Sequence, residues 1–274
     1  MMPRAVRNQQ VHDGTMLFVV ATIPTGGPAD HLQLVVVPLP HDITPRLNQP
    51  PHDVHVPRRR GPVHRIRIVT FLSIVHVQAA LQQCYPITAQ HSIIVVNHDA
   101  GGMLPIRTWP RDRFIALIRR LLANDPRRLV VLMGIAEAAE SARDITAQVD
   151  DPRCIDFVGR TRTLTDVLQL FHQSDLLITN DSGPAHFATL TRIKSITLFG
   201  PETPVLYGTL GEHNVDLFAK LACSPCLSAM NHRHSPCVDN KCLQAISVDQ
   251  VLAEAERLLA IASTRVTLPA AVEA

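Results

Sequence analysis

From residue 92 onward, short apolar segments alternate with amphipathic ones, and this alternation constrains the fold of the chain more than any other feature. The apolar segments have the length of strands, and those between them carry apolar residues at helical spacing, as at Phe114, Leu117, Ile118 and Leu121. Repeated strand and helix units predict an α/β fold, a Rossmann-like parallel sheet with helices on both faces. We expect strands at residues 93–97, 129–133, 155–158, 176–179 and 195–199, and helices after Pro110, at 136–148, after Thr163, from Pro184 and at 247–262.

Local signals support several of these helix starts. Pro110 stands where a helix opens, a position at which its missing backbone donor costs nothing. Thr163 with Asp166, and Ser247 with Gln250, have the spacing of capping boxes. Ligands of such sheets bind at the carboxyl ends of the strands, so we expect the binding residues at those ends.

The first 62 residues have a different composition. They hold 10 of the 21 prolines, five of the 14 histidines and no glutamate. Because proline donates no backbone hydrogen bond, we predict an irregular, incomplete N-terminal region at residues 1–62. Residues 63–91 would connect it to a domain at 92–263, followed by a tail at 264–274; within the connection, residues 64–83 fit either a helix or a strand.

Composition also limits the partners of the chain. The net charge is +2, and the short Arg58, Arg59 and Arg60 cluster is the longest basic run, so we expect no nucleic-acid partner. No apolar run approaches the roughly 18 residues that span a bilayer, and the first ten residues lack the apolar core of a signal peptide. We therefore expect a cytoplasmic protein with at most peripheral contact with the inner membrane.

The segment at residues 180–186 carries the sharpest chemical signal. Asp181, Ser182 and Gly183 follow an apolar strand and precede Pro184, which opens a helix. Free backbone donors at such a turn suit a phosphate group. The alternative is an ordinary helix cap in which His186 only packs. A serine hydrolase is disfavoured, because a nucleophile and base four residues apart at one helix start seldom align.

Five segments in order resemble glycosyltransferase family 9, the heptosyltransferases. They are RTWP at 107–110, LMGIAE at 132–137, FVGRTRTL at 157–164, LLITNDSGPAHFATL at 176–190 and SITLFGPETP at 195–204. Together with a cysteine-bearing tail, they cover about 170 residues and correspond to the donor-binding, C-terminal half of a GT-B type enzyme.

The resemblance implies a reaction. Members transfer a sugar, typically heptose from an ADP-heptose-like nucleotide diphosphate, to a lipopolysaccharide core, with inversion at the anomeric carbon. The leaving diphosphate needs stabilisation by backbone donors and a cation, or by a metal. No Asp-x-Asp pair occurs in the sequence, which favours the metal-free route without a required cofactor. The implied partners are this donor and a glycolipid acceptor.

The resemblance also implies roles for single residues. Ser182 and Gly183 would hold the diphosphate, and Asp181 would orient the sugar or its phosphate oxygens. Arg107 matches a position, usually Lys in the family, that pairs with phosphate, and an arginine can make a two-pronged contact there.

Four further residues complete the expected donor site. Glu137 follows a glycine that ends a strand, where an acidic residue accepts hydrogen bonds from ribose hydroxyls; the alternative is a solvated helix start. Thr161 and Leu164 are expected to shape the nucleotide pocket. His186 either contacts phosphate or packs in its helix.

Four of the six cysteines crowd into one segment: Cys223, Cys226, Cys237 and Cys242. Four thiolates at this spacing are typical of a structural zinc site that holds an irregular loop. Disulfides and free thiols remain alternatives, although a reducing cytosol disfavours disulfides. The matching tail in part of the family indicates a structural element rather than chemistry.

The resemblance fails in the N-terminal region. Family members have a first Rossmann-like domain that binds the acceptor and supplies an Asp as general base, whereas residues 1–62 are too short for one. Asp30, after Gly26 and Gly27, is the candidate for that base. Two hypotheses follow: an inverting glycosyltransferase, or a catalytically incomplete nucleotide-binding remnant of one.

Overall fold

A six-stranded parallel sheet forms the centre of the computed structural model, which describes residues 76–102 and 104–262. Its strands follow one another in the order β3-β2-β1-β4-β5-β6, and every neighbouring pair is parallel. The order reverses between β1 and β4, as in Rossmann folds. The predicted fold class is therefore confirmed. The strands are β1 (Ser92–Asn97), β2 (Arg128–Met133), β3 (Cys154–Asp156), β4 (Leu176–Asn180), β5 (Lys194–Phe199) and β6 (Asn214–Phe218).

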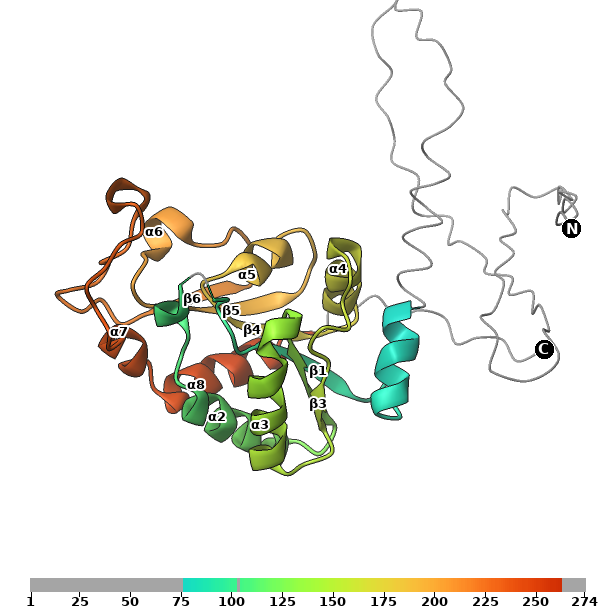
Figure 1. Cartoon of the computed structure of the whole chain (residues 1–274). Coiled ribbons are helices and arrows are strands. Elements are labelled where there is room, and N and C mark those ends of the chain that lie inside the picture. Colours follow the sequence, from blue (N-terminus) through green and yellow to red (C-terminus); the bar gives the residue numbers. More distant parts are fainter. Residues whose placement is uncertain (1–75, 103, 263–274) are drawn as a thin grey trace, which may run out of the picture. The chain divides into compact units, whose positions relative to one another are not determined.

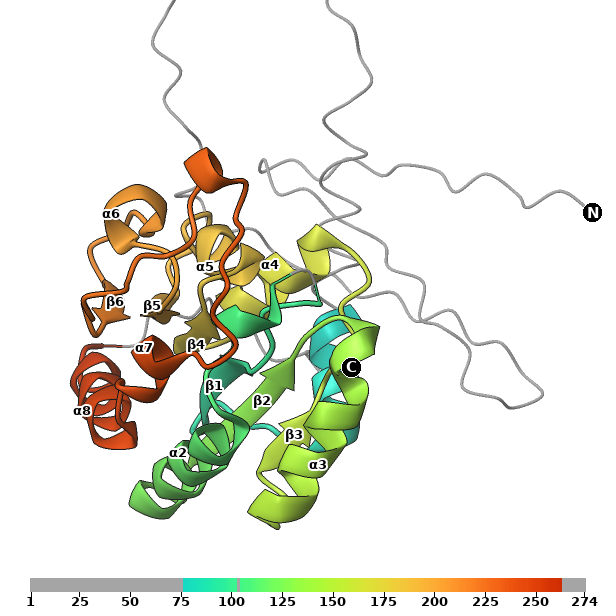
Figure 2. The ribbon, with the colours of Figure 1, turned by 60° about the vertical axis from the view of Figure 1, so that its left-hand side comes forward.

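Helices cover both faces of the sheet (Figure 1). Successive side chains of a strand point to opposite faces, so Ile94 and Val96 pack on one side and Ile93 and Val95 on the other. Figure 2 shows α2 and α3 together on one face. The first face is covered by α2 (Arg111–Asn124), α3 (Ala139–Val149) and α8 (Val248–Leu259), and the second by the helical residues 76–84, α4 (Leu164–His172) and α5 (Gly183–Ala188).

Short helical turns occupy the connections at the carboxyl side of the strands. They matter because they carry several of the expected site residues. These turns are η1 (Pro105–Arg107), η2 (Ala136–Ala138), α6 (Pro204–Tyr207), η3 (Ala229–Asn231) and α7 (Lys241–Gln244).

The helix starts follow the sequence signals closely. Thr163 accepts from the backbone of Asp166, whose carboxylate accepts in return, and Ser247 forms the same box with Gln250. The predicted helix at 136–148 begins as the 3-10 turn η2 before α3. Residues 64–83 were expected to form either a helix or a strand. Their described part, from residue 76, is a helix.

One strand was not predicted, and some predictions lie outside the described residues. Strand β6 was not predicted; its residues are half-buried at the edge of the sheet and gain their regular pairing from β5. The predictions for residues 1–62 and 264–274, including Asp30, lie outside the described residues.

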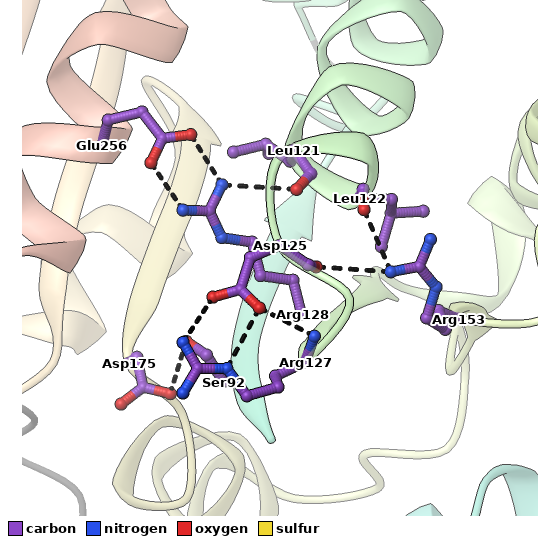
Figure 3. A network of polar contacts seen from close by, with 9 residues as sticks. All are labelled: Ser92, Leu121, Leu122, Asp125, Arg127, Arg128, Arg153, Asp175 and Glu256. Carbon is purple, nitrogen blue, oxygen red and sulfur yellow. Dashed lines mark hydrogen bonds and ion pairs between the residues drawn. The ribbon is translucent and has the colours of Figure 1, made fainter. Parts of the chain in front are cut away.

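A polar network lies at the opposite, amino-terminal ends of the strands (Figure 3). The guanidinium of Arg128 donates two parallel hydrogen bonds to Glu256 of α8, at 2.6 and 2.5 Å. Asp175 accepts from the backbone of Ile93 at 2.9 Å and from the hydroxyl of Ser92 at 3.1 Å. Arg128 is buried, so this pairing satisfies a charge removed from water and ties α8 to β2.

Replacing Arg128 by Ala is expected to lower the free energy of unfolding by about 1 to 3 kcal/mol, because it breaks a buried two-pronged pair. Arg257→Ala is the matched control, since Arg257 pairs with Glu254 on the exposed surface of α8 and should contribute at most about 0.5 kcal/mol. Urea unfolding measures both values. Equal losses in the two variants would show that the Arg128 pair does not hold α8.

Candidate functional site

A pocket of about 370 Å³ opens at the carboxyl ends of β1, β2 and β4. It lies where the strand order reverses, so the connections leaving β1 and β4 diverge and leave a crevice between them. The connections after β1 and β2 and the starts of α4 and α5 form its walls. Among the lining residues are Asn97, Ile135, Thr161, Ser182 and Phe187.

Asn97 joins two walls of the pocket. Its side-chain amide donates to the hydroxyls of Thr179 and Ser182, both at 3.1 Å. This fixes the last residue of β1 to the turn after β4. Sequence reasoning assigned Asn97 no role, although a polar residue that ends an apolar strand was a usable signal.

Arg107 and Asp181 come together although 74 positions separate them; neither lines the pocket, but Asp181 directly precedes the lining residue Ser182. Nη1 of Arg107 lies 3.9 Å from Oδ2 of Asp181 and 3.1 Å from Oε2 of Glu202. Arg107 ends η1, Asp181 follows β4 and Glu202 follows β5, so all three lie at the carboxyl edge of the sheet. The side chains of Asp181 and Glu202 are 5% and 2% exposed, which leaves the guanidinium as a cation between two buried carboxyls.

The electrostatics of this edge favour protonated carboxyls. Burial raises the pKa of Asp181, the neighbouring Glu202 raises it further, and Arg107 only partly opposes both. Burial also raises the pKa of Asp216, on β6, to about 6. A carboxyl that keeps its proton near neutral pH can donate a hydrogen bond to an anionic ligand, whereas a carboxylate would repel it.

The raised pKa values predict a pH dependence of stability. The folded chain holds these protons more tightly than the unfolded chain, so the contribution of these two carboxyls to the free energy of unfolding is fully present below about pH 4 and is lost as the pH rises through about 6. Asp216→Asn removes one such proton and should flatten this decline. Denaturant unfolding at a series of pH values tests it; an unchanged slope in the variant would contradict the assignment.

The structure separates the remaining expected donor residues into two groups. Thr161, Ser182 and Gly183 line the pocket. Glu137 and His186 are exposed, on η2 and α5, and are not part of its lining. The exposure of His186 disfavours the alternative in which it only packs in its helix.

The expectation of a zinc site is not supported. Within the described residues, no group of three or more His, Cys, Asp or Glu side chains is placed to hold a metal ion, and all four cysteines are free thiols. Burial raises the pKa of the Cys242 thiol, and the nearby Cys226 and Cys237 raise it further, so these three thiols are not far apart. Cys237 and Cys226 hydrogen-bond to Asp239 and Ser235 instead, Cys223 is exposed, and Cys242 is buried in α7.

The cysteine-bearing segment, residues 222–243, nevertheless contacts the site. The backbone amides of Cys226 and Leu227 both donate to the carbonyl of Pro201, at 2.8 Å. The side chain of Asn240 donates to the carbonyls of Ile106 and Thr108, at 3.1 and 2.8 Å. The segment is thus attached to the two connections that carry Glu202 and Arg107.

Comparison with known proteins decides the family. The family model described as glycosyltransferase family 9 (heptosyltransferase) matches residues 73–235, more than half of the chain. This chain belongs to glycosyltransferase family 9. Among curated relatives, lipooligosaccharide heptosyltransferase 2 of Campylobacter jejuni subsp. jejuni serotype O:6 is 32% identical over 97 residues, which cover 35% of this chain and 29% of that protein.

Two solved structures share the fold of this family 9 chain. ADP-heptose lps heptosyltransferase II of E. coli has a TM-score of 0.54 and 22% identity, covering 67% of this chain and 51% of that one. The family 9 glycosyl transferase of Veillonella parvula DSM 2008 has a TM-score of 0.57 and 24% identity, covering 70% and 52%. The chain therefore spans about half of these structures and less than a third of its curated relative.

None of the helices within residues 76–102 and 104–262 is long and apolar enough to cross a bilayer.

Proposed function

We propose that the chain takes part in glycosyl transfer and that its pocket binds the nucleotide diphosphate of a sugar donor. The observation that carries the proposal is the meeting of Arg107 with Asp181, which directly precedes Ser182 in the lining of a pocket at the switch point of a family 9 sheet. A phosphate-pairing cation and a sugar-orienting carboxyl are the groups that such a donor requires. ADP-heptose is the proposed donor, because the E. coli structural relative is named for it.

The nucleoside is proposed to occupy the wall formed by Thr161 and Leu164, which both line the pocket. Glu137 lies two residues beyond Ile135, another lining residue. Its exposed carboxylate is proposed to accept hydrogen bonds from the ribose hydroxyls.

The diphosphate is proposed to bind between Arg107 and the turn formed by Ser182 and Gly183. As the glycosidic bond breaks, negative charge builds on the diphosphate, and fixed donors stabilise it without reorganisation. Asp181 would orient the sugar. His186, two residues beyond the lining residue Pro184, is proposed to contact phosphate. Transfer by this route inverts the anomeric carbon and requires no metal.

The acceptor side of the proposal rests on the family alone. A glycolipid of the lipopolysaccharide core is the proposed acceptor, and the work of the enzyme would take place at the cytoplasmic face of the inner membrane. The base that activates its hydroxyl would come from outside the described residues, where Asp30 remains the candidate.

Two measurements on the whole chain test the proposal. Calorimetry compares ADP-heptose, ADP and adenosine, and a transfer assay with a lipopolysaccharide core acceptor is run with and without EDTA. Binding with EDTA-resistant transfer is expected. Binding without transfer would favour the catalytically incomplete remnant, and failure to bind any nucleotide would overturn the proposal.

A further inference from the structure

We propose that Arg233, carried by the cysteine-bearing segment, is a second phosphate-binding cation, and that Glu202 positions it beside Arg107. The inference rests on the proposed function, because its ligand is the diphosphate of the donor. Sequence reasoning gave neither Arg233 nor Glu202 a role.

One buried carboxylate joins the two arginines. Oε2 of Glu202 lies 3.1 Å from Nη1 of Arg107, and Oε1 lies 3.2 Å from Nε of Arg233. The two guanidiniums are therefore held on the two oxygens of one carboxylate. Arg107 approaches from η1 and Arg233 from the turn after η3, so the pair closes the carboxyl edge of the sheet from two directions.

The backbone of the segment fixes the position of Arg233. Its amide donates to the carbonyl of Ser228 at 2.9 Å, and the two bonds to Pro201 hold the segment next to Glu202. The guanidinium also lies over the ring of Tyr207, 5.9 Å from its centre, at the end of α6. Arg233 is thus directed toward Glu202 by its own segment and by α6.

Charge explains why a second cation is needed. Without Arg233, Arg107 would face two buried carboxyls, Asp181 and Glu202, and a diphosphate would meet a neutral or negative surface. With Arg233, the two positive charges of the arginines equal or exceed the negative charge on Asp181 and Glu202. The side chain of Arg233 is 47% exposed, so its two Nη groups remain accessible to a ligand while Nε is paired.

Unpartnered atoms mark where the ligand would bind. In the described part of the chain, Nε of Arg107 and Oδ2 of Asp181 are buried and have no hydrogen-bond partner, whereas Oε1 of Glu202 has its ion pair with Arg233. Buried polar atoms are normally satisfied, so an unpaired arginine N–H and an unpaired carboxyl oxygen indicate a polar ligand that completes them. A diphosphate supplies acceptors for the arginine, and the protonated form of Asp181 supplies a donor to it.

Calorimetry of ADP, AMP and adenosine with Arg233→Ala tests the inference. We expect ADP binding to weaken by about tenfold or more, AMP binding by less, and adenosine binding to stay unchanged. Arg257→Ala is the charge-matched control and should leave all three affinities unchanged, because Arg257 lies on α8 in an exposed pair with Glu254. Arg233→Gln retains most of the side-chain stem and should reproduce the loss if the charge is responsible.

The positioning role of Glu202 is tested by a double-mutant cycle. If Glu202 holds Arg233 in place, Arg233→Ala should weaken ADP binding less in a Glu202→Gln background than in the unaltered chain. Equal effects in both backgrounds would overturn that role.

The outcomes separate this inference from the proposed function. If Arg107→Ala weakens ADP binding and Arg233→Ala behaves like Arg257→Ala, only the second cation is overturned. If the chain binds no ADP, both are overturned.

Discussion

Replacing Trp109 by Ala is expected to lower the free energy of unfolding by about 3 to 5 kcal/mol, the usual range for removing a buried aromatic side chain. Trp109 is 0% exposed and packs edge-on against Phe114, with ring centres 5.0 Å apart. Its indole donates to the carbonyl of Ile246 at 3.1 Å, and its backbone amide donates to the side chain of Asn180 at 2.8 Å. Denaturant unfolding measures the loss.

Trp109→Phe is the matched variant, since it keeps an aromatic ring and removes the indole N–H. It should lower the free energy of unfolding clearly less than the Ala change, because the ring is kept and the carbonyl of Ile246 retains its bond from Arg113 at 2.6 Å. A loss below about 1 kcal/mol for Trp109→Ala would contradict its place in the core.

Replacing Arg107 by Ala is expected to weaken ADP binding by about 1.5 to 3 kcal/mol, the range for a lost charged hydrogen bond, and adenosine binding much less. The contrast between the two ligands tests the role, since only ADP carries the diphosphate. Calorimetry provides both affinities, and unfolding of the same variant shows whether it remains folded.

Arg107→Lys separates charge from geometry. Lysine keeps the cation but not the planar fork, so ADP affinity should fall between that of the unaltered chain and that of Arg107→Ala. Equal losses for ADP and adenosine in Arg107→Ala would show that Arg107 supports the fold, through Asp181 and Glu202, rather than the phosphate.

Most of the sheet could be predicted because buried parallel strands are continuous apolar runs. The predicted strands 129–133, 176–179 and 195–199 each lie within a strand of the structure. Edge strand β6 carried no such signal: its residues NVDLF are half-buried and follow a connection with Gly208 and Gly211. Only pairing with β5 makes it regular, and pairing between distant segments is not visible in local periodicity.

The site was predictable only where it sits at strand ends. Asp181 and Arg107 could be placed at one edge because parallel strands share a direction, and the structure brings them within 3.9 Å. Glu202 and Arg233 could not be linked, since their ion pair depends on the irregular path of the segment between them. The cysteine spacing pointed to a metal for the same reason: spacing alone does not reveal where an irregular loop directs its side chains.

The attachment of the cysteine-bearing segment has a consequence for sequence variation. Its bonds end on the main-chain carbonyls of Ile106, Thr108 and Pro201, not on their side chains. Every amino acid carries that carbonyl, so these three positions can change without releasing the segment as long as the backbone keeps its path. Asn240 cannot be replaced in the same way, because its side-chain amide donates the bonds to both Ile106 and Thr108. Preserving these two bonds therefore depends on the identity of Asn240 itself, whereas the residues that accept them can vary.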